Sequence, residues 1–393
     1  MSTYDVIVVG LGALGAAALD RLSRRGLRVL GVDRFAPPHD RGSSHGELRI
    51  TRAAIGEGAE YVPLALRSHE LWREIERESG EELFVACGLL VLGKRGGAAR
   101  HHGQSDFVGN TIACAERFGI PHEMLDARVV QRRFPQFETG TDELGYYEPG
   151  AGFLRPERCV AAQLELARRR GADLRTSEKV VSLASARAAA GGGSVEVVTD
   201  RGRYLGRSVV VAAGPWLPEL VPAPIAQRFR VYRQVQHWFR PEVPSAFSRK
   251  RFPVFIWIYG DHAGAHLYGF PSDSADGAVK IASEDYASPV LPDSVQRSVD
   301  PDEAQATFDR HVRGRLHGLS PRLIRSSVCL YTSTEDGRFV IDAHPEIANV
   351  TILSACSGHG FKHSPALGEA VAERIVTGAS ALDLGPFALS RFG

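Results

Sequence analysis

Residues Tyr4–Asp33 read "YDVIVVGLGALGAAALDRLSRRGLRVLGVD", and this stretch sets the architecture of the chain. It begins with an apolar run of strand length (4–9), which is typical of a strand buried on both faces in a parallel sheet. A glycine-rich turn and an alanine-rich segment of helical length follow, and a second apolar run ends at Asp33. Strand, turn, helix and strand in this order predict a parallel β–α–β unit.

The turn of this unit contains Gly10, Gly12 and Gly15 in the spacing G-x-G-x-x-G. The first two glycines allow a tight turn and a close approach of the backbone to a pyrophosphate, and the third lets the helix pack on the sheet. Asp33 falls where a carboxylate would bind a ribose hydroxyl. In this context the motif favours a dinucleotide site over a plain packing unit, but it does not choose between NAD and FAD.

Length, charge and cysteine usage narrow the class of protein. The chain has 393 residues, which predicts about two domains, and its net charge of +1 offers no electrostatic footprint for nucleic acid or an anionic membrane. No apolar run is long enough to span a membrane, and the N-terminus lacks the features of a secretion signal, so we expect a cytoplasmic protein. Five scattered cysteines argue against a disulfide framework and a zinc site, and no metal is expected.

Further elements are expected on both sides of the first unit. Apolar residues recur at helical spacing in 61–78 and in 157–170. Residues 178–183 and 194–199 have the composition of a strand pair, and the alanine- and glycine-rich stretch between them is expected to be a flexible connection. Residues 207–216 predict one more buried strand, which ends near a glycine.

The composition changes after residue 220 and changes back near the C-terminus. Aromatic and β-branched runs separated by proline and glycine predict an antiparallel sheet after residue 220. Residues 349–356 then predict a strand, 357–360 a turn and 364–378 a helix. A nucleotide-binding domain therefore is expected to be interrupted by a β-rich domain and completed by the C-terminus.

One cysteine lies in a distinctive setting. The stretch "SSVCLYT" (326–332) places Cys329 among strand-forming residues, two positions before Tyr331. Considered alone, Cys329 is expected to be a small buried residue, because free cysteine is among the most buried residue types. A covalent bond to another group is the alternative.

Several long motifs occur in an order that resembles one family of flavoenzymes, the monomeric sarcosine oxidases and N-methyltryptophan oxidases. The motifs are "APPHDRGSSHGELRITRAAIGEGAEYVPLALRSHELW" (36–72), "YEPGAGFLRPE" (147–157), "YGFPS" (268–272), "SSVCLYT", "FVIDAHPE" (339–346) and "SGHGFKHSPALGE" (357–369). The similarity runs from the glycine turn to the final "LSRF".

The resemblance implies an α/β plus α+β fold, in which a Rossmann-like FAD-binding domain is interleaved with an antiparallel-sheet catalytic domain. We expect the FAD-binding domain to comprise residues 1–84, 150–219 and 336–393. The substrate and catalytic domain is expected to comprise residues 85–149 and 220–335.

The resemblance also implies covalent FAD, held by an 8α-S-cysteinyl thioether to Cys329, while the other cysteines are expected only to pack. The residues expected to bind FAD are Gly10, Gly12, Gly15, Asp33, Ser43, Arg49, Val180, Gly214, Cys329, Gly358, Gly360 and Lys362. A covalent link prevents loss of the flavin and is expected to raise its electron affinity.

The family's substrates are amino acids, so they carry a carboxylate. Arg52 and Lys362 match the family's carboxylate-binding pair, since a guanidinium can grip a carboxylate with two hydrogen bonds and an ammonium adds a point charge. Tyr268 matches a further substrate-binding residue. The alternative for Arg52 is a surface arginine, which is common in a chain with 42 of them.

Lys280 matches the lysine that helps oxygen accept electrons from reduced flavin. Only five lysines occur in the chain, and two of them, Lys280 and Lys362, fall where the family has lysine. If Phe270 pairs with Ala278 in a hairpin, Tyr268 lies opposite Lys280 on one face. The remaining catalytic candidates are His45 and Arg49, which match family positions near the flavin, and Tyr331, which would lie on the same strand face as Cys329. A structural role is the alternative for each.

The chain departs from the family pattern around the substrate. Glu284 stands where the sarcosine oxidases have a histidine, and Leu48 stands where they have a threonine. Trp257 and Tyr259 are expected to add bulk to the substrate pocket. Sarcosine itself is therefore not predicted as the substrate.

The sequence thus predicts a cytoplasmic, monomeric FAD-dependent oxidase of secondary or N-methyl amino acids, with a small amino acid and O2 as its partners. The C–N bond would be oxidised to an imine, and O2 would be reduced to hydrogen peroxide. Two alternatives stay open: an oxidase of cyclic imino acids in secondary metabolism, and a subunit or sensor that binds FAD without turnover.

Overall fold

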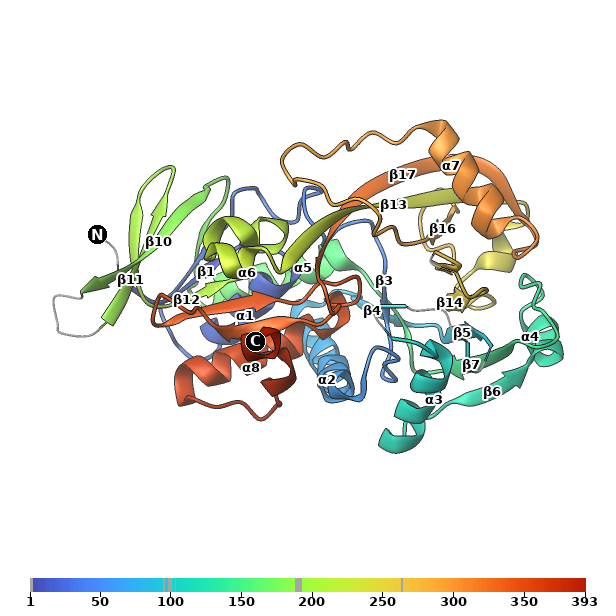
Figure 1. Cartoon of the computed structure of the whole chain (residues 1–393), viewed down its shortest axis with the longest axis horizontal. Helices are drawn as coiled ribbons and strands as arrows, with labels where there is room; N and C mark the ends of the chain where they lie inside the picture. The colour runs from blue at the N-terminus through green and yellow to red at the C-terminus, as the bar shows by residue number, and fades with distance from the viewer. Residues whose placement is uncertain (1–2, 95, 98–100, 103, 188–192, 263) are drawn as a thin grey trace.

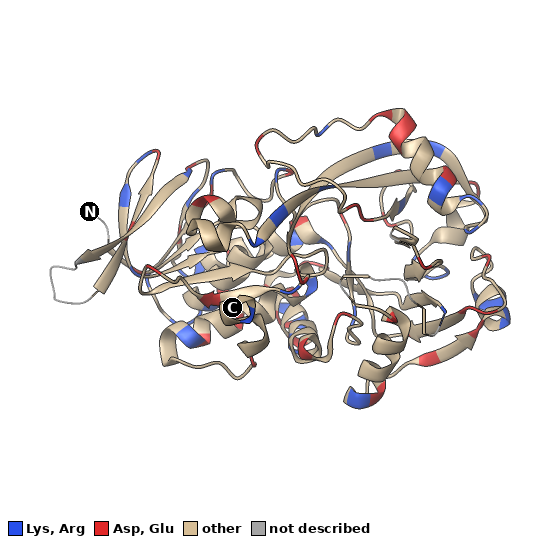
Figure 2. Cartoon of the chain, in the orientation of Figure 1, with Lys and Arg blue, Asp and Glu red and all other residues tan. Residues whose placement is uncertain are grey.

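The structure is a computed structural model, and it describes the chain apart from residues 1–2, 95, 98–100, 103, 188–192 and 263. The polypeptide is elongated, with one large sheet in each half (Figure 1). Basic and acidic residues are interspersed along the chain in both halves (Figure 2), in keeping with the net charge of +1. Among the described residues, no helix is long and apolar enough to cross a membrane.

The first large sheet has a parallel centre, built on the predicted β–α–β unit. Its parallel strands run in the order β19 (Val350–Ser354), β12 (Arg203–Val211), β1 (Thr3–Val9), β2 (Val29–Val32) and β9 (Asp173–Arg175). Antiparallel strands extend it: β18 (Val340–Ala343) pairs with β19, and the hairpin β10 (Val180–Arg187) and β11 (Gly193–Thr199) pairs with the first half of β12. The strands β1 and β2 are apolar because the sheet buries both of their faces.

Four helices pack together beside the parallel strands. They are α1 (Ala13–Ser23), α2 (Val62–Ser79), α5 (Pro156–Arg169) and α8 (Ser364–Thr377), and α1 contacts both α5 and α8. The buried residues of α2 and α5 follow the helical spacing seen in the sequence. The expected strand pair β10–β11 is present, whereas residues 188–192 of the connection between its strands lie outside the described residues.

The second large sheet occupies the other half of the molecule. Its strands run in the order β17 (Leu319–Thr334), β13 (Phe229–Pro241), β16 (Val279–Ala282), β15 (His266–Gly269), β14 (Val254–Ile258), β5 (Leu89–Gly93), β7 (Leu144–Glu148) and β6 (Glu123–Asp126). All neighbouring pairs are antiparallel except β14 and β5. The antiparallel sheet predicted after residue 220 is therefore present, and the domain limits given above stay a prediction.

Shorter elements complete the fold. A small sheet joins β3 (Arg49–Thr51), β8 (Gly152–Leu154) and β4 (Phe84–Ala86). The remaining α-helices are α3 (Phe107–Phe118), α4 (Ala127–Arg133), α6 (Ala223–Ala226) and α7 (Pro301–Thr307).

One strand contributes to the cores of both halves. Phe229, at the start of β13, packs in the core of the first sheet with Val195 and Val209. Phe239, near the end of the same strand, packs in the core of the second sheet with Phe308. The strand β13 pairs with β17 along almost its whole length, and the two strands form a long ribbon (Figure 1).

The predicted register of the hairpin around residues 271–278 is wrong. The structure pairs Tyr268 with Ala282, and the amide of Phe270 donates to the carbonyl of Lys280 at 3.0 Å. The register is shifted by two residues, because more residues of this segment belong to the connection than the sequence indicated. A shift of two keeps each side chain on its face, so Tyr268 and Lys280 still share a face but are not opposite one another.

Candidate cofactor and substrate cavity

The glycine turn between β1 and α1 has little room for side chains. Gly10 has a φ of +87°, and a Cβ there would lie 2.4 Å from the carbonyl oxygen of Ala212. A Cβ at Gly15 would lie 1.7 Å from the oxygen of Gly10, so α1 packs directly on the turn. A Cβ at Gly12 would meet only the hydroxyl of Ser44, at 3.3 Å. The turn therefore presents bare backbone, as the close approach of a pyrophosphate requires.

One continuous cavity begins at this turn and extends to the second sheet. The expected FAD-binding residues that line it are Gly10, Gly12, Asp33, Ser43, Arg49, Val180, Gly214, Gly358, Gly360 and Lys362. The candidates Arg52, Tyr268 and Tyr331 line it as well. Gly15, His45, Lys280 and Cys329 do not line it. A cavity that joins the glycine turn to these side chains fits an elongated dinucleotide whose reactive end lies between the two sheets.

Asp33 ends β2 at the nucleotide end of the cavity. Its carboxylate accepts hydrogen bonds from the amides of Leu11 and Phe35, each at 2.7 Å, which fixes it against the glycine turn. Ser44, a residue that the sequence motifs did not single out, accepts from the amide of Ala13 at 3.1 Å. This hydroxyl satisfies a free donor at the start of α1, and it lines the cavity.

Cys329 lies on β17, just behind the cavity wall. Its thiol is fully buried and accepts a hydrogen bond from the side-chain amide of Gln236 at 3.3 Å. Burial raises the pKa of this thiol, while Arg49 and Lys280 act in the opposite direction. A different cysteine, Cys356, lines the cavity itself. Two thiols therefore lie close to the space where a flavin would be held.

Arg49 and His45 lie beside this part of β17. The guanidinium of Arg49 donates to the backbone oxygens of Ser43 at 2.8 Å and Leu48 at 3.0 Å, and also to the oxygen of His45. Burial, together with the charge of Arg49, lowers the pKa of His45 to about 4. The imidazole of His45 is therefore neutral near pH 7, and Arg49 organises the backbone of residues 43–48.

Lys280 is buried against the same backbone. Its ammonium donates to the carbonyl oxygens of Gly46 at 2.7 Å and Leu48 at 2.8 Å, and the residue is 1% exposed. The nitrogen also lies over the rings of Phe270, at 4.8 Å, and Trp238, at 5.4 Å. Burial lowers the pKa of Lys280 well below its ordinary value, and Arg49 adds to this effect.

Arg52 lines the cavity from the stretch after β3. Its guanidinium pairs with Glu57 at 2.6 Å and donates to the oxygen of Ala54 at 2.7 Å. Arg52 is 1% exposed, so the alternative that it is a surface arginine is wrong. Burial opposes the ionisation of Glu57, but Arg52 and Lys362 hold the pKa of this carboxyl well below its usual range.

Lys362 follows the turn after β19 and lines the same cavity as Arg52. Its nitrogen donates to the backbone oxygen of His359 at 2.6 Å. Burial lowers the pKa of Lys362 to about 7, although the charge of Glu57 opposes this. A carboxylate that entered between Lys362 and Arg52 would stabilise the ammonium form and would be held by charge-assisted hydrogen bonds.

The structure adds a chain of charged groups that the sequence motifs did not reveal. His102 contacts Glu57 at 3.1 Å through one ring nitrogen and Glu284 at 2.9 Å through the other. Burial disfavours a charge on His102, but Glu284 and Glu57 raise its pKa to about 9. Burial likewise disfavours the charge on Glu284, yet His102 keeps its pKa low. The only sequence signals were the His101–His102 doublet and the departure at Glu284.

The expectation that Trp257 and Tyr259 narrow the substrate pocket is wrong. The Trp257 ring lies in the core of the second sheet, where its nitrogen donates to Glu143 at 2.7 Å, and Tyr259 contacts His311 at 2.7 Å. The residue of β14 that lines the cavity is Ile256, because alternate residues of a strand face opposite sides. The departures at Leu48 and Glu284 do line the cavity.

A glycine turn at one end of the cavity and buried cationic side chains at the other define a dinucleotide-dependent enzyme. The family model described as "FAD dependent oxidoreductase" matches residues 5–374, and the chain belongs to this family. The predictions of an FAD-dependent oxidoreductase and of its fold class are confirmed, and FAD rather than NAD is the cofactor of the family.

Two relatives match almost the whole chain. The chain is 39% identical to the monomeric sarcosine oxidase of Streptomyces avermitilis, over 98% of this chain and 97% of that protein. It is 33% identical to the N-methyl-L-tryptophan oxidase of Salmonella dublin, over 99% of each protein. The resemblance inferred from the sequence motifs is therefore confirmed.

A solved structure shares the fold over almost the whole chain. It is the Tyr258Phe mutant of NikD, described as an unusual amino acid oxidase essential for nikkomycin biosynthesis. Its TM-score is 0.83 at 24% identity, and the match covers 99% of this chain and 97% of that one.

Proposed function

We propose that this chain is an FAD-dependent oxidase of amino acids whose amine is secondary or N-methylated. The product would be an imine, which water hydrolyses, and the electrons would reduce O2 to hydrogen peroxide. The observation that carries the proposal is the placement of two buried cationic side chains, Arg52 and Lys362, in the same cavity as the glycine turn. The names of the two relatives support the class of substrate.

The side chains at this end of the cavity can bind and orient an amino acid. Arg52 and Lys362 would hold its carboxylate, and the chain Glu57–His102–Glu284 compensates their charge when no substrate is bound. The hydroxyls of Tyr268 and Tyr331, 3.3 Å apart, form a polar wall that would position the amine. Orientation of this kind supplies much of the rate advantage of a cofactor enzyme.

The residues present fit FAD. The bare glycine turn and Asp33 would hold its pyrophosphate and ribose, while Arg49 and Gly358–Gly360 would face its ring. When bound, FAD would accept the hydrogen and the electron pair from the C–H bond next to the amine and pass the electrons to O2. Lys280, as an ammonium held by the carbonyl oxygens of Gly46 and Leu48, would supply positive charge near the site of oxygen reduction.

We further propose that the flavin is attached through Cys329, as the motif in β17 implies. Cys356 is the rival thiol, because it lines the cavity whereas Cys329 lies behind the wall. The protein should stay yellow after acid precipitation. Cys329→Ser should release its flavin, and Cys356→Ser should retain it. Loss of the colour in Cys356→Ser alone would assign the bond to the other thiol, and a colourless wild-type precipitate would exclude covalent attachment.

The function is tested by offering a panel of N-methyl, cyclic and primary amino acids and measuring hydrogen peroxide. Secondary or N-methyl amino acids should give peroxide, while the corresponding amines without a carboxylate should not, because Arg52 and Lys362 would lack a partner. Peroxide with cyclic imino acids alone would favour that alternative. Release of no peroxide with any amine, by protein that contains flavin, would refute the proposal and leave a non-catalytic flavoprotein. We also expect a cytoplasmic monomer.

A further inference from the structure

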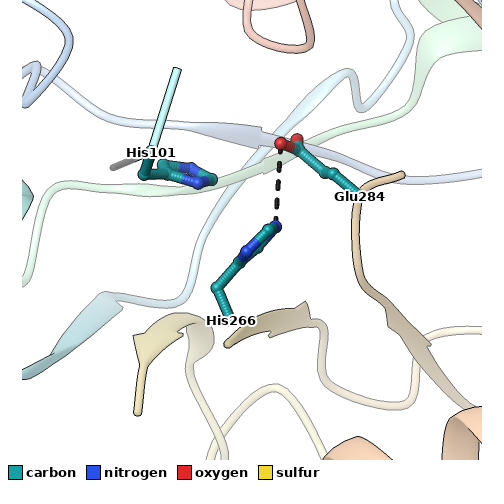
Figure 3. A group of neighbouring side chains, drawn as sticks. All are labelled: His101, His266 and Glu284. Atoms are coloured by element: carbon teal, nitrogen blue, oxygen red, sulfur yellow. Dashed lines mark ion pairs between the residues drawn. The ribbon is translucent and has the colours of Figure 1, made fainter. Parts of the chain in front are cut away.

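Three side chains whose atoms could bind a metal ion converge beside the cavity. His101 comes from the segment before α3, His266 begins β15, and Glu284 follows the end of β16. One possible ligand atom from each of them lies within 4.8 Å of the other two. The three side chains point into a common space from three directions (Figure 3).

Among the residues that the structure describes, the buried nitrogen Nε2 of His266 has no hydrogen-bond partner. Its side chain is 10% exposed, and the nearest carboxylate oxygen, that of Glu284, is 3.8 Å away. This distance is too long for a hydrogen bond. A buried nitrogen without a partner costs free energy, so the arrangement is incomplete until something occupies the space that this nitrogen faces.

The distances between the ligand atoms suit coordination of a metal ion better than a direct hydrogen bond. Ligand atoms at about 2.1 Å from a tetrahedral ion lie about 3.4 Å apart. The separation of 3.8 Å between His266 and Glu284 is near this value, and since no other separation exceeds 4.8 Å, the remaining ones need a contraction of at most about 1.4 Å. Small side-chain rotations would achieve this contraction.

The outer contacts are also those of a metal site. The carboxylate of Glu284 is oriented by His102 at 2.9 Å and by the hydroxyl of Tyr286 at 3.2 Å. Hydrogen bonds of this kind fix and tune the ligands of metal sites.

We propose that His101, His266 and Glu284 form a binding site for one divalent ion of the zinc class. Two imidazoles and one carboxylate are a known ligand set for Zn²⁺, with a fourth position left to water or another ligand. Because His101 and Glu284 line the cavity, this fourth position faces the space proposed for the amino acid. The wide spacing of the cysteines argued against a cysteine zinc site, but no ligand here is a cysteine.

The site is tested on the flavin-containing protein, without any substrate, by equilibrium dialysis against Zn²⁺ and measurement of the bound metal. The wild type should bind one Zn²⁺ per chain and should bind Mg²⁺ far more weakly, because Mg²⁺ prefers oxygen ligands. His266→Ala and Glu284→Gln should each lower the affinity for Zn²⁺ by tenfold or more. His317→Ala, at an exposed imidazole, is the matched control and should leave binding unchanged.

Two further measurements distinguish zinc binding at this site from zinc binding elsewhere on the protein. Zn²⁺ should raise the melting temperature of the wild type and of His317→Ala but not that of His266→Ala, since a ligand stabilises only a protein that binds it. X-ray absorption of the bound zinc should show nitrogen and oxygen ligands. Sulfur ligands, equal affinity in His266→Ala, or the absence of a stoichiometric zinc in the wild type would overturn the proposal. Since no substrate is involved, these results do not depend on the oxidase proposal.

Discussion

The nucleotide end of the cavity is built around the backbone of the glycine turn, whereas the other end is made of charged side chains from segments far apart in the sequence. At the first end, Gly10 and Gly12 leave room, and Asp33 is held by two backbone amides. At the second end, Arg52, His102 and Glu284 are brought together from three separate segments.

Because of this difference, we expect the two ends of the cavity to respond differently to amino-acid substitution. At Gly10 and Gly15 an added Cβ would meet a fixed backbone carbonyl, so the turn cannot adjust to a substitution there. The charged network can instead redistribute its pairings when one member is removed, because each carboxylate has more than one partner. We therefore expect the largest effects at the nucleotide end and graded effects at the other.

Gly10→Ala should cause the largest effect. The new Cβ would lie 2.4 Å from the oxygen of Ala212, at a backbone conformation that favours glycine. The variant should lose most of its flavin and at least about 1 kcal/mol of stability. Absorbance of the purified protein gives the flavin content, and thermal unfolding gives the stability. Gly202→Ala, where a Cβ meets no atom within 4 Å, is the control and should keep its flavin.

Lys280→Met should slow the reaction of the reduced enzyme with oxygen by a factor on the order of a hundred, the scale of losing one preorganised charged group. Reduction by substrate without oxygen should change far less, and stopped-flow measurements separate the two steps. Lys250→Met removes an exposed lysine and should have no effect. A wild-type rate of oxygen reaction in Lys280→Met would show that this lysine only supports the backbone of Gly46 and Leu48.

Arg52→Ala should raise the inhibition constant of a simple carboxylic acid by roughly tenfold or more, since losing a charged hydrogen bond costs roughly 1.5–3 kcal/mol. Arg52→Lys should restore part of the affinity. Removal of the exposed Arg207 serves as the control. An inhibition constant that does not change in Arg52→Ala would place the carboxylate elsewhere.

The smallest effect is a pH dependence of carboxylate binding. With a pKa of about 7, Lys362 is an ammonium below pH 7 and neutral above it. Affinity for a carboxylic acid should therefore be highest below pH 7 and fall by up to about tenfold between pH 6 and pH 8. Lys362→Met should bind weakly with no such dependence over this range, and Lys362→Arg should bind without it because its charge is permanent. An unchanged pH profile in Lys362→Met would assign the titration to another group.

The elements that the sequence predicted correctly are those that depend on residues close together in the chain. The β–α–β unit at 4–33, the helices at 61–78 and 157–170 and the strand pair β10–β11 all follow from short-range patterns. A glycine turn has a fixed spacing because one loop makes the whole contact, so it can be recognised without a structure.

The errors have a common physical origin in the second sheet. The run that contains Trp257 is apolar on both faces, because one face packs in the core and the other lines the cavity. Because polar and apolar residues do not alternate in this run, the sequence does not indicate whether its odd- or even-numbered residues face the ligand. The predicted register of the hairpin was wrong for a similar reason, because the sequence does not show where the connection between β15 and β16 begins and ends. The contacts of Glu57 and Glu284 with His102 join residues 45 and 182 positions apart, which no local pattern reports.

The ribbon of β13 and β17 constrains how a substrate can enter. Its strands remain paired from Phe229 with Thr334 to Pro241 with Leu319, and its ends are anchored in the cores of both halves. A hinge between the halves would have to break this hydrogen-bonded ladder or bend it sharply. Access to the cavity is therefore expected to come from local rearrangement of its walls while the two halves keep their mutual orientation.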